Sequence, residues 1–521
     1  MQESRSQARR SPSVLPDFAT PSDEPRAPQG GRRAVVFLIF ALSLAAFIAA
    51  LEVVYAFFMA PRFGYLGYDY HEPDRAWMLA SFLMLLTVSF CLPYRPERFS
   101  GYAVWFLYAS LLVPISTVPL YGSTRTASDS FFFSLFCSAV WAGVALSVRR
   151  PAGQYFPITR RGSHALWATV IVLSTVTYVY LANVFGITFN VMSVFDIADT
   201  RLYYRDDLLP TVPFLGYLIA NQGNVINPFL MAYGTVRKRW LLVGLGAVGQ
   251  LVLYSTGGFK TVLLSIPLCI LLALFMRKRK SILGAAIVAS VAVLSWVSMA
   301  IDSLASIGVV DVLVARVFMV AGYLMPMYRD AYATEQWALW DYSFLGPFVT
   351  TPYTVSPGFY VSIMSLNRRD VQMNGSLFAD GYANLGLLGI VIEAAFLVLL
   401  LRFTDSSSRG LPIGLVVATG LLPVFTLGNV SSFTALLSSG FGLMFLLFAL
   451  YPREDAIGTV RQSGRVAPPR NRGDLLATGI GAMPLPPGSE GKSFKAPKAA
   501  SRWRQERALP RSGDVVRRTR Y

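Results

Sequence analysis

Long apolar stretches recur from residue 34 to residue 450, and they limit what this chain can fold into. Twelve of them approach the ~20 residues that an α-helix needs to cross a bilayer. Hydrophobic residues make up 54% of the 521 residues and charged residues 14%, whereas about 25% charged residues are typical of a soluble domain. The sequence therefore predicts an all-α, polytopic integral membrane protein with about twelve transmembrane helices.

The predicted helices divide the chain into three parts. Residues 34–450 form the transmembrane domain, between a basic N-terminal segment, 1–33, and a basic, Pro-rich C-terminal tail, 451–521. Both flanks have few large apolar residues, so we expect them to be disordered. The helices are predicted at 34–60, 76–94, 101–121, 129–147, 164–187, 212–234, 239–256, 261–276, 281–301, 383–401, 411–427 and 430–450.

Clusters of Lys and Arg recur in alternate turns and predict the orientation of the helices. The positive-inside rule places such turns in the cytoplasm, which puts both termini there and leaves the acidic residues on the outer face. The clusters are Arg95 and Arg98; Arg149, Arg150, Arg160 and Arg161; Arg237, Lys238 and Arg239; Arg277, Lys278, Arg279 and Lys280; and Arg402 and Arg409. Anionic lipid accounts for the net charge of +17, so no nucleic-acid partner is expected.

Cysteine and histidine are too scarce for a disulfide framework or a zinc site. The three cysteines, Cys91, Cys137 and Cys269, fall within or at the end of predicted helices. The two histidines, His71 and His164, are far apart in the sequence. We therefore expect no metal and no cofactor.

The predicted outer loop 302–382 is far longer than a connection requires, and such loops are usually functional. Residues 303–327 have helical periodicity, and the sequence EQWALWDYSFLGPF that follows is rich in aromatic residues. We expect an amphipathic or re-entrant helix followed by an aromatic belt at the membrane interface. The same aromatic rings could instead stack on sugars.

A second outer loop, 188–211, contains Arg201 and Arg205 four residues apart. If this piece is helical, both guanidinium groups share a face and suit a phosphate or pyrophosphate. The alternative is a set of local Asp–Arg pairs on a solvated loop, since exposed ion pairs are common.

Three segments resemble a known family. They are NGSLFADGYANLGLLGIVIEAAFLVLLL (374–401), STGGFKTVLLSIPLCILLALFMRKRK (255–280) and VARVFMVAGYLMPMYRDAY (314–332). Their pattern is similar to Wzy-type oligosaccharide repeat-unit polymerases, the bacterial O-antigen and exopolysaccharide polymerases. Two positions depart from the family: Lys260 stands where Arg is more usual, and Asp380 where Glu is. Lys keeps the charge but loses the bidentate fork.

The resemblance implies a metal-independent glycosyltransferase of the bacterial cytoplasmic membrane. On the outer face it would transfer a glycan from polyprenyl pyrophosphate onto the next lipid-linked repeat unit, with a chain-length regulator and a flippase as possible partners. Cations would stabilise the leaving group, and a carboxylate or imidazole would act as base. The implied catalytic residues are Asp380, Arg316 and His71, and the implied substrate-binding residues are Arg201, Arg205, Lys260, Arg329, Tyr382 and Asn384.

Each of these residues also has a purely structural interpretation. Asp380 could be a helix N-cap, and the arginines at 316 and 329 could extend along apolar helices to the membrane surface. Buried Glu52 and Glu393 could be functional or could pair helices. The same holds for the polar side chains at 221–227, which either line a cavity or join helices.

Two other functions share parts of this pattern. A transporter or flippase of lipid-linked oligosaccharide would also need many helices, although the two halves of the chain show no internal repeat of the kind common in carriers. A ligase that moves a finished glycan to another acceptor would share the donor chemistry. The sequence leaves both open.

Overall fold

The computed structural model describes residues 29–153, 155, 163–185, 213–277, 281–334, 336–343 and 345–453. In this part of the chain all regular secondary structure is helical, without β-strands. Nine of its helices are long and apolar enough to cross a bilayer. The prediction of an all-α, polytopic membrane protein is confirmed at this level.

The first half of the chain contains α1 (Gln29–Val54), η1 (Tyr55–Met59), α2 (Ala60–Phe63), η2 (Gly64–Leu66), α3 (Arg75–Ser89), α4 (Phe99–Leu107), η3 (Tyr108–Leu112), α5 (Val113–Thr117), η4 (Val118–Leu120), α6 (Ala127–Arg149), α7 (Ser163–Phe185), α9 (Pro213–Asn221), η6 (Gln222–Ile226), α10 (Asn227–Arg237) and α11 (Trp240–Gly257). The second half contains α12 (Lys260–Met276), α13 (Gly284–Ala305), η7 (Asp311–Met319), α14 (Val320–Ala331), η8 (Gly346–Phe348), α15 (Pro357–Leu366), α16 (Leu377–Ser407), α17 (Ile413–Thr426), α18 (Ser432–Leu437) and α19 (Phe441–Leu450).

Each of the twelve predicted segments contains a helix, but the number of membrane crossings is a separate matter. Helices α3, α12 and α17 have 15, 17 and 14 residues, short of a full crossing. The composite α9–η6–α10 is not among the nine span-length apolar helices of the described residues, whereas Asp311–Ala331 is. Twelve crossings therefore stay a prediction.

The span-length helix Asp311–Ala331 lies inside the predicted outer loop. It is η7 followed by α14, and 61% of its most apolar window is buried. Asp311 in its first turn pairs with Arg62 just after α1, at 3.0 Å, and Arg329 in its last turn pairs with Asp129 at the start of α6, at 2.9 Å. Both partners belong to the face predicted to be outer. The segment expected to lie at the interface is thus a core helix whose two ends contact the same predicted face.

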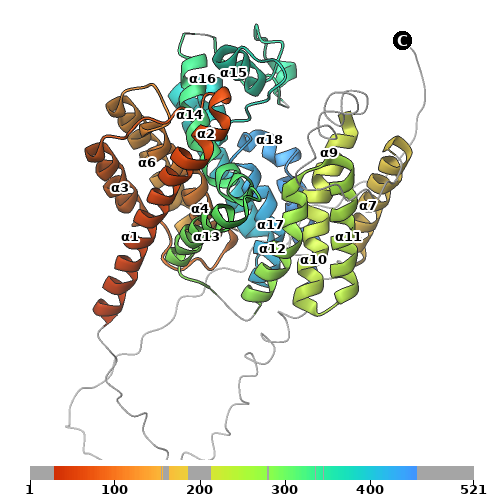
Figure 1. Cartoon of the computed structure of the whole chain (residues 1–521). Helices are drawn as coiled ribbons and strands as arrows, with labels where there is room; N and C mark the ends of the chain where they lie inside the picture. The colour runs from red at the N-terminus through yellow and green to blue at the C-terminus, as the bar shows by residue number, and fades with distance from the viewer. Residues whose placement is uncertain are drawn as a thin grey trace, which may run out of the picture. The chain divides into compact units, whose positions relative to one another are not determined.

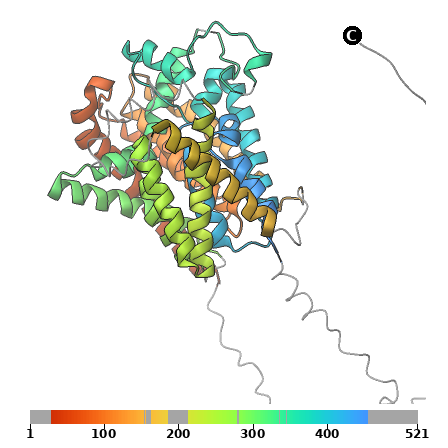
Figure 2. The same cartoon turned by 90° about the vertical axis from the view of Figure 1, so that its right-hand side faces the viewer.

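The helices pack in two groups that share α17 (Figure 1). In one, α1 packs along α13, α14 packs on α5 and α16, and α6 packs on α3 and α16. In the other, α10 packs on α11, α12 and α17, and Figure 2 shows α7 and the α9–α11 group from the side. This arrangement brings α2, α15 and the start of α16 to one end of the molecule, called the pocket end below.

A buried hydrogen-bonded chain of amides joins the helices of the second group. Gln222 Nε2 donates to Asn227 Oδ1 at 2.8 Å, Asn227 Nδ2 donates to Gln250 Oε1 at 3.2 Å, and Gln250 Nε2 donates to Ser265 Oγ at 2.8 Å. These residues come from η6, α10, α11 and α12. Of the two interpretations of the polar run at 221–227, Gln222 and Asn227 fit the one in which they hold helices together.

Several arginines of the predicted cytoplasmic turns donate to backbone carbonyls at or just beyond the ends of helices. Arg402 Nη2 donates to Ser147 O in the last turn of α6 at 2.9 Å, and this contact satisfies a carbonyl that the helix leaves unpaired. Arg149 Nη2 donates to Leu92 O, after α3, at 2.9 Å, and Arg409 Nη2 to Ala152 O, after α6, at 3.1 Å. These cations therefore have a structural function whichever way the protein is inserted.

Candidate functional site

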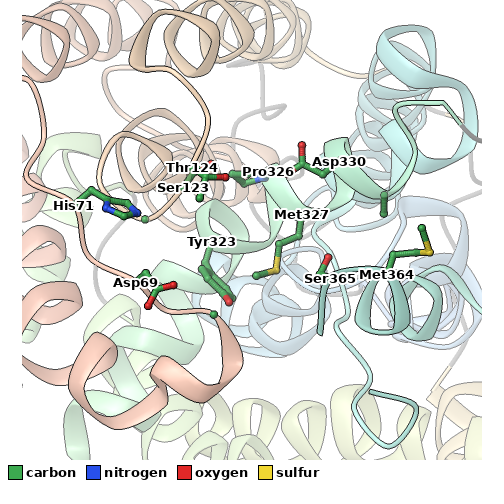
Figure 3. A pocket seen from close by; sticks show the side chains of 13 residues that line it. Asp69, His71, Ser123, Thr124, Tyr323, Pro326, Met327, Asp330, Met364 and Ser365 are labelled. Atoms are coloured by element: carbon green, nitrogen blue, oxygen red, sulfur yellow. The ribbon is translucent and has the colours of Figure 1, made fainter. Parts of the chain in front are cut away.

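A cavity of about 340 Å³ opens at the pocket end (Figure 3). Its wall combines carboxylates, hydroxyl groups and apolar side chains from four stretches of chain. The lining residues are Gly67, Asp69, His71, Gly122, Ser123, Thr124, Tyr323, Pro326, Met327, Asp330, Ala331, Met364 and Ser365. His71, one of the predicted catalytic residues, therefore lies at an open polar cavity.

Short-range contacts hold the cavity wall in place. Tyr323 stacks on Tyr68 with ring centroids 3.7 Å apart, and its hydroxyl donates to Leu66 O. The backbone N–H of His71 donates to Tyr121 O at 2.8 Å. Between these anchors Gly67 adopts φ +84°, which is accessible to glycine without strain and lets the chain turn after η2. The wall is thus fixed before any ligand binds.

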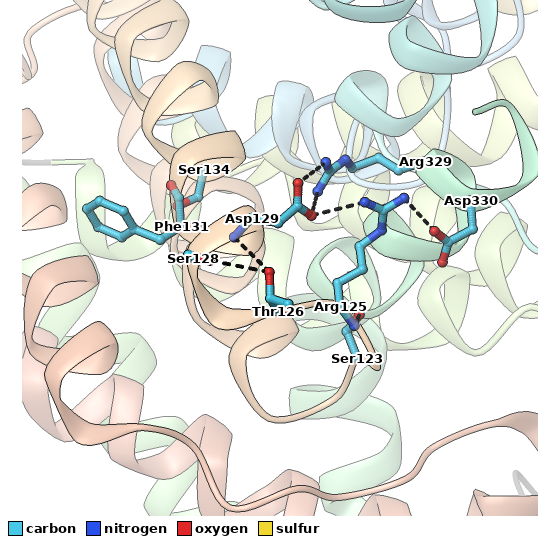
Figure 4. Close-up of polar contacts among 9 residues, drawn as sticks. All are labelled: Ser123, Arg125, Thr126, Ser128, Asp129, Phe131, Ser134, Arg329 and Asp330. Carbon is cyan, nitrogen blue, oxygen red and sulfur yellow. Dashed lines mark hydrogen bonds and ion pairs between the residues drawn. The ribbon is translucent and has the colours of Figure 1, made fainter. Parts of the chain in front are cut away.

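Two arginines and two aspartates form an ion network beside the cavity (Figure 4). Arg329 Nη1 and Nη2 donate to the two carboxylate oxygens of Asp129 at 3.0 and 2.9 Å. Arg125 Nη1 donates to the same carboxylate at 2.9 Å, and its Nη2 donates to Asp330 at 2.5 Å. Because Asp330 also lines the cavity, the network and the cavity share a wall.

The two guanidinium groups are partly sheltered, whereas their acidic partners are open to solvent. The side chains of Arg125 and Arg329 are 23% and 12% exposed, against 40% and 54% for Asp129 and Asp330. Arg329 also lies 4.1 Å over the ring of Phe133, a favourable position for a cation. The Nε of each arginine is buried without a hydrogen-bond partner among the described residues.

Electrostatics keep Arg125 charged. Burial alone lowers the pKa of Arg125, but the hydrogen bonds and charges of Asp129 and Asp330 outweigh it and raise the pKa above its usual range. The guanidinium groups of Arg125 and Arg329 thus converge on the carboxylate of Asp129 next to an open cavity. Such forks suit carboxylates and phosphates equally well.

A second acidic cluster is buried beneath the segment Gln336–Ser343. Asp380, 7% exposed, accepts a hydrogen bond from the Tyr342 hydroxyl at 2.5 Å and from Asn384 Nδ2 at 2.9 Å. The N-cap of α16 is Ser376, whose side chain accepts from the backbone N–H of Ala379 at 3.4 Å. The N-cap interpretation of Asp380 is therefore wrong, because its carboxylate faces Tyr342 and Asn384 instead.

Glu393 is the deeper member of this cluster and is fully buried. One carboxylate oxygen accepts from Trp340 Nε1 at 2.8 Å and from Ser431 Oγ at 2.5 Å, and the other accepts from the backbone N–H of Ser432 at 2.7 Å. Trp340 and the backbone amide can only donate. Each carboxylate oxygen of Glu393 thus has at least one donor.

A break in α16 brings the two carboxylates of this cluster to the same place. Leu385 and Gly386 have non-helical backbone angles, and Gly386, at φ +60°, adopts a conformation that favours glycine. Across the break Gly389 approaches Gly381 so closely that an added Cβ would lie 1.8 Å from Gly381 O. The glycines of the sequence GYANLGLLG therefore fold the start of α16 back over its own continuation.

Tyr342 connects the segment 336–343 to this cluster. Its pKa is raised well above the usual value, first by burial and then by the charge of Asp380. The phenol is therefore a persistent donor to Asp380 at neutral pH. Asn384 donates to the same hydroxyl at 2.9 Å, which fixes the direction of the Tyr342 O–H bond toward Asp380.

The structure brings several predicted site residues together and separates others. Tyr382 packs edge-on against Phe133 and against Trp337, with ring centroids 6.0 Å apart in each pair. Arg329 lies over the other partner of this contact, the ring of Phe133. Arg316 is exposed on η7, and its charge acts on Tyr68, whose ring stacks on Tyr323 of the cavity wall. Lys260 begins α12 and contributes to the electrostatics of Asp311. Arg201 and Arg205 lie outside the described residues.

Sequence reasoning did not identify Arg125, Asp129, Asp69 or Asp330 as site residues. A partial signal exists, because Arg125 and Asp129 are four residues apart at a helix start, a spacing that pairs charges. The long-range contact between Asp129 and Arg329 has no local signature. Among the described residues no group of three or more His, Cys, Asp or Glu side chains is placed to hold a metal ion.

Comparisons with known proteins identify no relative. No protein-family model, no curated protein and no solved structure matches this chain. The inference of function therefore depends on the residues and their geometry.

Proposed function

We propose that this protein is a membrane glycosyltransferase that polymerises polyprenyl-pyrophosphate-linked oligosaccharide repeat units on the outer face of the bacterial cytoplasmic membrane. The observation that carries the proposal is the convergence of Arg125 and Arg329 beside an open polar cavity. The family resemblance of residues 255–280, 314–332 and 374–401 adds to it.

The arginines suit the leaving group of this reaction. When the bond between the sugar and the pyrophosphate breaks, negative charge grows on the phosphate oxygens, and preorganised cations lower the barrier. Arg125 Nη2 donates to the exposed carboxylate of Asp330. A pyrophosphate that displaces this carboxylate would bind Arg125, while Asp129 continues to hold Arg329 beside it.

The cavity suits a sugar acceptor. Its carboxylates and hydroxyl groups offer hydrogen-bond acceptors and donors for sugar hydroxyls, and the ring of Tyr323 and the side chains of Met327 and Met364 offer apolar contact. A base takes the proton of the attacking hydroxyl as this oxygen bonds to the anomeric carbon. The candidates are His71, which lines the cavity, and Asp380, which the segment 336–343 covers.

An assay with purified protein in lipid nanodiscs tests the proposal. The substrate is a polyprenyl-pyrophosphate-linked oligosaccharide, and products are separated as a ladder on a gel. We expect a ladder with the wild type and its loss with Arg329→Ala. Arg368→Ala is the matched control, because Arg368 also pairs with a carboxylate, Asp370, at 2.5 Å, but that pair shares no residue with the cavity wall or with the ion network of Arg125 and Arg329.

The alternatives give different products in the same system. Transfer of a finished glycan to a different acceptor, without lengthening of the repeat unit, would point to a ligase. Movement of the lipid-linked sugar across a vesicle membrane, again without lengthening, would point to a flippase. Either result would overturn polymerisation.

A further inference from the structure

The segment Gln336–Ser343, called the strap below, covers the start of α16. Ala338 and Trp340 in the strap are 1% and 5% exposed, so the strap is packed into the molecule although it contains no helix or strand. Trp340 also packs on Phe433 of α18 with ring centroids 5.2 Å apart. Asp380 lies beneath the strap and is thereby shielded from solvent.

The strap is attached to α16 mainly by polar contacts. The backbone N–H of Ala338 donates to Ala383 O at 3.0 Å, and that of Trp340 donates to Asn384 Oδ1 at 2.5 Å. The side chains of Trp340 and Tyr342 donate to Glu393 and Asp380. Both side-chain bonds end on a buried carboxylate, so the attachment depends on groups that are costly to bury without donors.

The backbone of the strap is strained. Leu339 and Trp340, two consecutive bulky residues, have φ of +50° and +56°, a region that side chains with a Cβ rarely adopt. Such a conformation persists only where surrounding contacts impose it, and it is concentrated at clamps and switches. Without its bonds to α16, the strap would relax to an ordinary conformation and uncover Asp380.

We propose that the strap opens to admit the acceptor glycan to Asp380, and that Glu393 is the latch that closes it through Trp340. This inference rests on the proposed glycosyl transfer. It gives Glu393 a positioning function, since Glu393 acts through Trp340 and does not touch the substrate. It also explains how Asp380, a predicted catalytic residue, can reach the substrate although the strap covers it in this structure.

Hydrogen exchange measured by mass spectrometry tests the opening without any activity assay. Amides of the strap should exchange faster than those of residues 377–384 beneath it, because the strap opens while α16 stays folded. Glu393→Gln replaces one carboxylate oxygen by an N–H₂ group, which cannot accept a hydrogen bond, and leaves a weaker acceptor in place of the other. The hydrogen bond from Trp340 is therefore weakened, and the exchange rate of the strap amides should rise on the order of tenfold with little change in those of α16. Arg368→Ala should leave strap exchange as in the wild type. Equal exchange of strap and α16 in both proteins would overturn the inference.

A reversible lock tests whether opening is required for transfer. The backbone N–H of Ala338 donates to Ala383 O at 3.0 Å, so the strap and α16 adjoin at these residues, and the pair Ala338→Cys and Ala383→Cys is the one to test for a disulfide across the strap. Oxidation should reduce glycan lengthening on the order of tenfold or more, and a reductant should restore it. Each single variant, oxidised in the same way, controls for effects on the native Cys91, Cys137 and Cys269.

The two measurements separate the strap from the proposed function. Full lengthening by the oxidised double variant would overturn the strap as a gate while leaving the polymerase intact. Absence of lengthening by the wild type would overturn the proposed function and with it the gate to Asp380, and the exchange experiment would still decide whether the strap opens.

Discussion

Two acidic clusters, one on α6 and α14 and the other on α16, belong to helices that pack on one another, and they are built in opposite ways. Asp129 and Asp330 are 40% and 54% exposed at their side chains and pair with guanidinium groups. Asp380 and Glu393 are 7% and 0% exposed and are held by a phenol, an amide, an indole, a serine hydroxyl and a backbone N–H. The first cluster combines charges at the surface, and the second surrounds carboxyl groups with neutral donors in the interior.

The difference indicates what each cluster can contribute. Exposed ion pairs add little to stability and exchange partners readily, so the network of Arg125 and Arg329 is available to an anionic substrate. A buried carboxylate depends on every donor around it, because each unpaired buried group is costly. We therefore expect substitutions in the buried cluster to change folding and substitutions in the exposed cluster to change chemistry.

Removal of the Glu393 carboxylate is expected to have the largest effect. Glu393→Ala leaves Trp340 Nε1, the Ser431 hydroxyl and the Ser432 N–H without their acceptor, so the free energy of unfolding should fall by about 3 kcal/mol or more. Denaturant titration in detergent micelles measures it. Asp370→Ala is the matched control, because Asp370 is 60% exposed and pairs with Arg368, which is 38% exposed, and should cost about 1 kcal/mol or less. Equal losses would remove the distinction between the clusters.

The exposed cluster should respond in activity instead. Arg329→Ala removes a bidentate cation next to the cavity and should lower the rate of glycan lengthening on the order of a hundredfold, as expected for a group that stabilises charge in the transition state. Arg329→Lys keeps the charge but loses the fork and should lower the rate by about tenfold. Gel ladders at saturating substrate measure both. A normal rate in Arg329→Ala would exclude this network from the reaction.

The sequence predicts the buried cluster less well than it predicts the helices around it. Apolar runs of about 20 residues identify helices, because the backbone in a bilayer must bond internally. That rule covers α6 and α13, whose predicted segments match the structure within four residues at each end, and α1 and α16, whose ends differ from the predicted ones by five or six residues. It fails for Asp311–Ala331, because Asp311, Arg316 and Arg329 interrupt the apolar pattern although the helix is largely buried.

Individual contacts within the site could not be derived from local patterns. Asp380 and Asn384 are four residues apart, and their hydrogen bond follows from helical spacing. The bonds from Trp340 to Glu393 and from Arg329 to Asp129 join residues 53 and 200 positions apart. They depend on the break at Gly386 and on the packing of α6 against the other helices, which no single segment of sequence specifies.

Tyr342→Phe tests the hydrogen bond that joins the strap to Asp380. Loss of this bond should lower the free energy of unfolding by about 1 kcal/mol at neutral pH. The raised pKa of Tyr342 means that its contribution is fully present below the pKa of an unfolded tyrosine, about 10, and is lost as pH rises above it. The wild type should therefore lose part of its advantage over the variant above about pH 10. Tyr65→Phe, at a ring that is 68% exposed, should leave the stability at neutral pH unchanged.

Asp330→Asn should have the smallest effect on stability, and it tests whether the exposed cluster binds the anionic part of the substrate. Asparagine keeps the size of the side chain at the cavity wall but removes the charge that holds Arg125. Because the Asp330 side chain is 54% exposed, the free energy of unfolding should change by about 0.5 kcal/mol or less.

The same substitution should change substrate binding. Because the Asp330 carboxylate competes with an anionic substrate for Arg125, the KM for the lipid-linked oligosaccharide should fall a few-fold with little change in kcat. Asp370→Asn, in the pair with Arg368 outside the cavity, should leave KM unchanged. A higher KM in Asp330→Asn would mean that Asp330 binds the substrate itself, which would assign this end of the cavity to sugar hydroxyls and leave Arg329 as the principal cation for the phosphate.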